Sequence, residues 1–194
     1  MTELADPLRL LREVAAVLDR LGLPYCVGGS WAAGLFGEPR MTRDLDLIVP
    51  LEAGAVEELA AALEPRFYVN RDAMLEAVRE RRAFNAIDPE SGLKVDFFVR
   101  GDSPFDHEEF RRRRAESFDE QGEIRLQVKS PEDSVLRKLL CYREGGSVSE
   151  QQWRDVLGIL SVSAGTLDEA HLDHWAGELG LTDLLARARA EARD

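Results

Sequence analysis

The chain has 194 residues, 44% of them hydrophobic, and a formal net charge of −12 from 25 basic and 37 acidic side chains. This size and composition indicate one globular domain, or a core with a small appendage. The negative charge disfavours a broad DNA- or RNA-binding surface, although a local basic patch or a small polycationic ligand stays possible.

The sequence shows no membrane or secretion signal. No stretch approaches the roughly 20 apolar residues of a membrane span, and the charged N-terminus does not resemble a signal peptide. Cys26 and Cys141 lie far apart in apolar segments. We therefore expect two buried thiols rather than a disulfide, in a cytoplasmic protein.

The N-terminal part is predicted to begin with a helix and two short strands. The helix follows from apolar residues at helical spacing, namely Leu4, Leu8, Leu11, Ala15 and Leu18. A short strand over 24–27 leads into a glycine turn, and a short helix follows over 31–36. Residues 44–49 alternate in polarity and predict a strand, which Pro50 ends.

Two helices, a hairpin and two further strands are expected next. The helices cover 52–63 and 71–82. The strands 83–87 and 93–99 flank a turn-forming segment rich in Pro and Gly, which predicts an antiparallel hairpin. Short strands are also expected near 114–118 and 124–128.

From Ser130 onwards the pattern is helical. Ser130 is a good helix cap, and Pro131 suits the first helical position. The apolar spacing predicts four helices, over 135–142, 150–160, 167–179 and 181–192. The sequence therefore predicts an α+β fold with a mixed sheet in a core domain, 1–129, and a helical subdomain, 130–194.

A glycine turn and an acidic pair predict a site for a nucleoside triphosphate and a metal. In Gly28-Gly29-Ser30 the backbone N–H groups can approach phosphate oxygens closely, since no bulky side chain intrudes. On an extended strand, Asp44 and Asp46 point to the same face, as ligands of a divalent metal would.

Asp96 is the third candidate carboxylate. It interrupts an apolar strand, where an isolated charge is costly. If this strand neighbours that of Asp46, the three carboxylates converge, and two magnesium ions bridging them to a triphosphate would relieve their repulsion. Asp96 would then be a metal ligand or a general base. The alternative is a simple ion pair with Lys94 on the same face.

These elements together resemble the DNA polymerase β-like nucleotidyltransferase superfamily, over about residues 24–99. The matching positions are Gly28, Gly29, Ser30, Asp44, Asp46 and Asp96. The resemblance implies in-line transfer of a nucleoside monophosphate from a nucleoside triphosphate (NTP) to an acceptor hydroxyl, with release of pyrophosphate and with Mg²⁺ as the metal.

Two later segments are similar to the AbiEii-type nucleotidyltransferase toxins. They run from Val128 to Leu139 and from Gln152 to Leu157, and the lead Arg40-Met41-Thr42-Arg43 is also similar. The similarity implies that Lys138 meets nucleotide phosphates and that Asp155 supports the site. Alternatively, Lys138 is solvated and Asp155 pairs on the surface.

Three functions follow as hypotheses. The first is a toxin of a toxin–antitoxin pair that modifies tRNA or a protein, with an antitoxin as partner. The second is an aminoglycoside or lincosamide nucleotidyltransferase, and the third a catalytically silent nucleotide-binding partner. Other polar groups are expected to be solvated, namely His171, His174 and the run Arg111–Arg114, for which a patch that binds RNA phosphates is the alternative.

Overall fold

The computed structural model describes residues 7–119 and 122–193 and divides them into two compact units. The first unit holds the described residues up to Gly28 together with Thr42–Val128. The second holds Gly29–Met41 and the chain from Lys129. This grouping differs from the predicted domains, 1–129 and 130–194, in the segment 29–41. Residues 1–6, 120–121 and 194 of those predicted domains lie outside the described residues.

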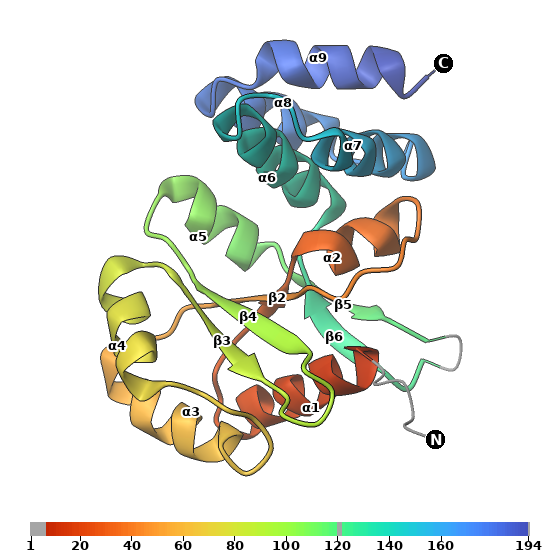
Figure 1. The fold of residues 1–194 in the computed structure, drawn as a ribbon. Coiled ribbons are helices and arrows are strands. Elements are labelled where there is room, and N and C mark those ends of the chain that lie inside the picture. The colour runs from red at the N-terminus through yellow and green to blue at the C-terminus, as the bar shows by residue number, and fades with distance from the viewer. Residues whose placement is uncertain (1–6, 120–121, 194) are drawn as a thin grey trace. The chain divides into compact units, whose positions relative to one another are not determined.

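The first unit is built on one mixed sheet (Figure 1). Among the described residues it contains six strands: β1 Cys26–Val27, β2 Leu45–Val49, β3 Ala83–Ile87, β4 Lys94–Val99, β5 Arg114–Ser117 and β6 Arg125–Val128. Their order is β3-β4-β2-β1-β6-β5. The pairs β2–β4 and β1–β6 are parallel and the others antiparallel.

The alternation predicted for 44–49 is present in β2. Leu45, Leu47 and Val49 are buried, while Asp46 and Ile48 on the other face are partly exposed. Buried residues of three helices complete the core, namely those of α1 Pro7–Arg20, α3 Val56–Leu63 and α4 Arg71–Glu80. Each fully buried Leu contributes about 1.5–3 kcal/mol of hydrophobic stabilisation.

The starts of two predicted helices differ from the prediction or cannot be compared with it. A short 3₁₀ turn, η1 Ala53–Ala55, replaces the start of the helix predicted over 52–63. Leu4 of the predicted first helix lies outside the described residues.

The hairpin β3–β4 is confirmed, and its turn is fixed by a buried aspartate. Asp88 is 0% exposed. Its carboxylate accepts hydrogen bonds from the Glu90 N–H at 3.0 Å, the Ser91 hydroxyl at 2.5 Å and Arg66 Nη1 at 2.5 Å. Burial alone would raise the pKa of Asp88, but these hydrogen bonds outweigh it and lower the pKa below the ordinary value.

The helix α5, Pro104–Arg111, was not expected from the sequence. Ser103 caps it and forms a capping box with Asp106. The same order, Ser-Pro-x-Asp, occurs at Ser130. The cap residues are therefore a local sequence signal for this helix.

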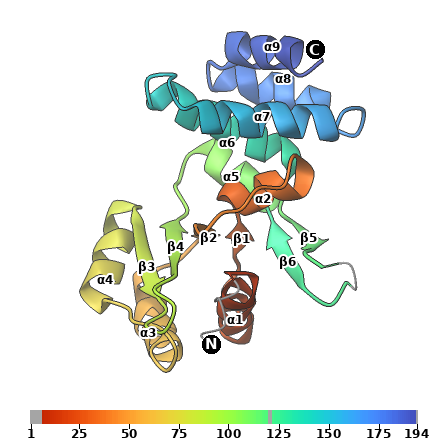
Figure 2. The ribbon, with the colours of Figure 1, turned by 45° about the vertical axis from the view of Figure 1, so that its right-hand side comes forward.

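The second unit consists of helices (Figure 2). They are α2 Gly29–Phe36, α6 Pro131–Glu144, α7 Glu150–Val162, α8 Glu169–Glu178 and α9 Thr182–Glu191. The chain just after α2 lies against α7, because a Cβ added to Gly37 would lie 2.8 Å from the backbone N of Ile159. The Ser163 hydroxyl also donates to the Phe36 carbonyl at 2.8 Å. None of the helices within the described ranges is long and apolar enough to cross a membrane.

Two expectations about side-chain exposure are wrong. Cys26 is buried as predicted, but Cys141 is exposed, because it lies two residues from the buried Leu139 and so faces away from the helix's buried side. His171 is not solvated, since its side chain is 8% exposed and Nε2 lies 2.8 Å from Oδ1 of the fully buried Asp133. The buried Asp133 requires such polar partners.

Candidate functional site

Two of the three predicted carboxylates are register partners in the first unit. β2 and β4 are neighbours, and Asp46 pairs with Asp96 along their parallel ladder. Residues that pair in this way point to the same face of a sheet. Asp44 directly precedes Leu45, which pairs with Val95, so Asp44 and Lys94 stand at corresponding positions one residue before the first residues that pair.

Lys94 lies among these carboxylates. Its Nζ donates a hydrogen bond to Asp96 Oδ2 at 2.8 Å, with side-chain exposures of 48% for Lys94 and 18% for Asp96. The hydrogen bond to Asp96 raises the pKa of Lys94 against the effect of desolvation, and the charges of Asp44 and Asp46 raise it further. The ion pair considered as the alternative for Asp96 is therefore present.

The chemistry of these side chains suits a hard divalent cation, because carboxylate oxygens are the ligands that Mg²⁺ prefers. In the ranges described, however, no three His, Cys, Asp or Glu side chains are grouped so that they could hold a metal ion. A cationic ammonium group instead contacts Asp96. The carboxylates thus match a divalent cation in donor type, and Asp46 and Asp96 are adjacent in register, while one oxygen of Asp96 is engaged by Lys94.

The glycine turn connects β1 to α2. Gly29 adopts a positive φ of 56°, which glycine tolerates better than other residues. The Gly28 N–H donates to the Asp46 carbonyl at 3.0 Å. This N–H is therefore engaged with the acidic strand, whereas the first N–H groups of α2, those of Gly29 and Ser30, have no partner within the helix.

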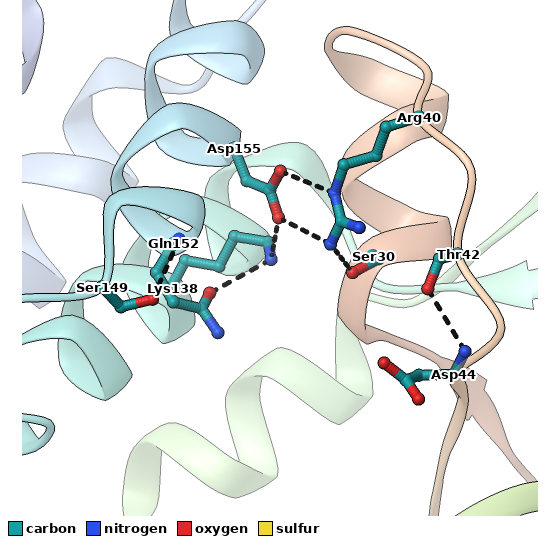
Figure 3. Close-up of polar contacts among 8 residues, drawn as sticks. All are labelled: Ser30, Arg40, Thr42, Asp44, Lys138, Ser149, Gln152 and Asp155. Carbon is teal, nitrogen blue, oxygen red and sulfur yellow. Dashed lines mark hydrogen bonds and ion pairs between the residues drawn. The ribbon is translucent and has the colours of Figure 1, made fainter.

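Asp155 lies between two cations in the second unit (Figure 3). Lys138 Nζ donates to Asp155 Oδ2 at 2.7 Å, and Arg40 Nε donates to Oδ1 at 3.2 Å. The side chains of Lys138 and Asp155 are 8% and 7% exposed. Both expected alternatives, a solvated Lys138 and a surface pair for Asp155, are thus wrong, because α6 and α7 bury the two groups together.

Ser30 and Gln152 extend this cluster. Arg40 Nη2 donates to the Ser30 hydroxyl, and Lys138 Nζ donates to Gln152 Oε1 at 3.2 Å. One carboxylate between two cations leaves an excess of positive charge beside a hydroxyl at the start of a helix. Such an arrangement can bind a phosphate group.

Arg40 was not predicted as a site residue, although it begins the segment Arg40-Met41-Thr42-Arg43 that carried the resemblance. Its contact with Asp155 spans 115 residues of sequence, so no local pattern reveals it. Thr42 in the same segment has a local role, since its hydroxyl accepts a hydrogen bond from the Asp44 N–H at 3.2 Å.

The arginine run 111–114, from the end of α5 to the start of β5, makes local contacts. Arg111 pairs with Glu108 at 2.6 Å, and Arg114 pairs with Glu116 at 2.6 Å. Arg113 lies over the ring of Phe110, 4.3 Å from its centroid. The expectation of a solvated face therefore holds for Arg111 and Arg114, which are exposed, but not for Arg112 and Arg113, which are half-buried.

The fold is similar to that of known nucleotidyltransferase structures, whereas no protein-family model and no curated protein matches the sequence significantly. The antibiotic-resistance factor ANT(2'')-Ia in solution aligns with a TM-score of 0.52 and 18% identity, covering 95% of this chain and 93% of that one. An antigenic nucleotidyltransferase-like protein from Paracoccidioides brasiliensis aligns with a TM-score of 0.53 and 17% identity, covering 95% and 92%. The chain therefore has the α+β nucleotidyltransferase fold.

Proposed function

We propose that this protein is a metal-dependent nucleotidyltransferase that moves a nucleoside monophosphate from an NTP, such as ATP, to an acceptor hydroxyl. The observation that carries the proposal is the pairing of Asp46 with Asp96 on neighbouring parallel strands, in a chain with the nucleotidyltransferase fold. The proposal places the protein in the cytoplasm, where NTPs and Mg²⁺ are available.

In the first unit, the carboxylates of Asp44, Asp46 and Asp96 would hold Mg²⁺, which we expect as two ions. When bound, Mg²⁺ would neutralise charge on the phosphates and the leaving pyrophosphate. Asp96 has the further role of accepting the proton of the acceptor hydroxyl.

In the second unit, the cluster of Ser30, Arg40 and Lys138 would bind the triphosphate, together with the N–H groups at the start of α2. Asp155 would act as a positioning residue, because it holds both cations by hydrogen bonds. Gly28 would contribute through its bond to the Asp46 carbonyl rather than through a phosphate contact.

For the acceptor, we propose first a toxin-type activity on tRNA or on a protein, with an antitoxin as partner. The segments Ser130–Asp133 and Trp153–Asp155 support it by their similarity to the AbiEii-type toxins. Asp155 lies at the centre of the cation cluster, which is consistent with a role at the phosphates.

The second candidate is nucleotidyl transfer to a cationic antibiotic. It is favoured by the net charge of −12, which attracts small polycations and repels bulk RNA. The fold likeness to an antibiotic-resistance factor, over 95% of this chain, also favours it.

An acceptor panel separates these candidates. Purified protein is incubated with Mg²⁺ and each α-³²P-labelled NTP, with total tRNA, aminoglycosides, lincosamides or a protein extract as acceptor. Label on tRNA or protein that is lost in Asp46→Ala supports the toxin-type activity, and label on the drug alone supports the second candidate. Tight NTP binding without any transfer would favour the catalytically silent alternative and contradict both.

A further inference from the structure

We propose that Lys94 is a built-in counter-cation, which holds Asp96 in the metal-free protein and must release it when a divalent cation binds. Lys94 is then a positioning residue that sets the affinity of the carboxylates for metal. This inference rests on the proposed function, because it concerns the same carboxylates.

The first support is geometric. Lys94 and Asp96 are two residues apart on β4, so their side chains share one face of the sheet. The Nζ–Oδ2 distance is 2.8 Å, so one oxygen of Asp96 is engaged by an ammonium group at the place where a metal would bind.

The second support is electrostatic. Without a cation, Asp44, Asp46 and Asp96 would repel one another. The charges of all three act on Lys94, so one ammonium group partly neutralises the cluster. A divalent cation brings twice that charge and can bind several oxygens at once, whereas Lys94 contacts Asp96 through one hydrogen bond.

The chain contains 22 arginines and three lysines, yet a lysine stands beside Asp96. An arginine would bind a carboxylate in a bidentate manner, whereas a lysine is a mobile point charge on a flexible stem. The 48% exposure of the Lys94 side chain leaves room for it to swing into solvent.

The test measures binding of Mn²⁺ alone, without nucleotide, by electron paramagnetic resonance. Lys94→Met removes the competing charge, and we expect it to bind Mn²⁺ about tenfold more tightly than the wild type. Lys94→Arg, which holds Asp96 more firmly, should bind no more tightly than the wild type. Arg79→Gln is the control: it removes the same charge from an exposed side chain on α4 and should change the affinity less than twofold.

A double mutant shows whether the higher Mn²⁺ affinity of Lys94→Met depends on Asp96. In an Asp96→Asn background, Lys94→Met should give little gain, because the pair is already broken. An unchanged or weaker affinity of Lys94→Met, or a full gain in that background, overturns the inference. Asp46→Asn tests the proposed metal site separately: if it binds Mn²⁺ as well as the wild type, the site itself is wrong, whatever Lys94 does.

Discussion

At Asp155, a single carboxylate is shared by two cations from distant parts of the chain. It accepts from Lys138 at 2.7 Å and from Arg40 at 3.2 Å, and its side chain is 7% exposed. Buried charges are costly unless they are paired and hydrogen-bonded. Asp155 therefore offsets the cost of burying the Lys138 side chain.

Replacing Asp155 by Asn should destabilise the protein strongly. The substitution keeps the shape but leaves the Lys138 ammonium buried without its counter-charge, which costs about 3 kcal/mol. Urea denaturation monitored by circular dichroism measures the loss. Glu178→Gln, on an exposed position of α8, is the control and should change stability by about 0.5 kcal/mol or less. Equal stability of the two variants would show that the Asp155 pairs do not stabilise the fold.

At the scale of elements, the hairpin β3–β4 presents Lys94 and Asp96. Its register is set by its turn, where Asp88 receives hydrogen bonds from Ser91, Glu90 and Arg66. Phe84 and Phe97 stack across the two strands on the buried face, with ring centroids 4.8 Å apart. Turn and core thus fix the same register, which leaves Asp96 opposite Asn85 and Asp46.

Because of Asp88 in this turn, the stability of the protein should depend on pH in the acidic range. Since folding lowers the pKa of Asp88, its contribution is present above the unfolded pKa of about 3.9 and is lost as the pH falls through the folded value. Asp88→Asn should cost about 2 kcal/mol at pH 7 and should flatten the stability profile below about pH 4. Urea denaturation between pH 2.5 and 7 measures both effects.

Glu90→Gln is the matched control in the same turn. Glu90 is 83% exposed and lies 3.6 Å from Arg66, so its loss should cost about 0.5 kcal/mol or less. A pH profile of Asp88→Asn that runs parallel to the wild type down to pH 2.5 would show that Asp88 does not carry the acid dependence.

Elements with strong periodicity could be predicted from the sequence. The alternation in β2 and the turn residues between β3 and β4 are local signals, and burial follows them directly. Arg40 and His171 could not be placed, because each is fixed by a partner far along the chain, Asp155 and Asp133. The pairing of β2 with β4 is also non-local. The sequence indicates that Asp46 and Asp96 are candidate site residues, but only the strand order of the sheet shows that they are adjacent.

At the scale of the whole molecule, the chain alternates between its two units. It leaves the first unit after Gly28, returns at Thr42 and leaves again after Val128. The first unit carries acidic side chains around Lys94, and the second carries cations around Asp155. The sequence division at residue 129 did not separate 29–41, because the grouping of α2 with α6 and α7 depends on tertiary packing at Gly37.

The proposed reaction transfers the α-phosphoryl group of an NTP together with its nucleoside, and the position of a radioactive label reveals this transfer. The protein is incubated with Mg²⁺, the acceptor panel and ATP labelled at either the α- or the γ-phosphorus, and likewise with the other NTPs. We predict that the α-label appears on an acceptor, that the γ-label is released as pyrophosphate, and that both products disappear in Asp46→Asn. Transfer of the γ-label to an acceptor, or release of orthophosphate with no labelled acceptor, would contradict the account.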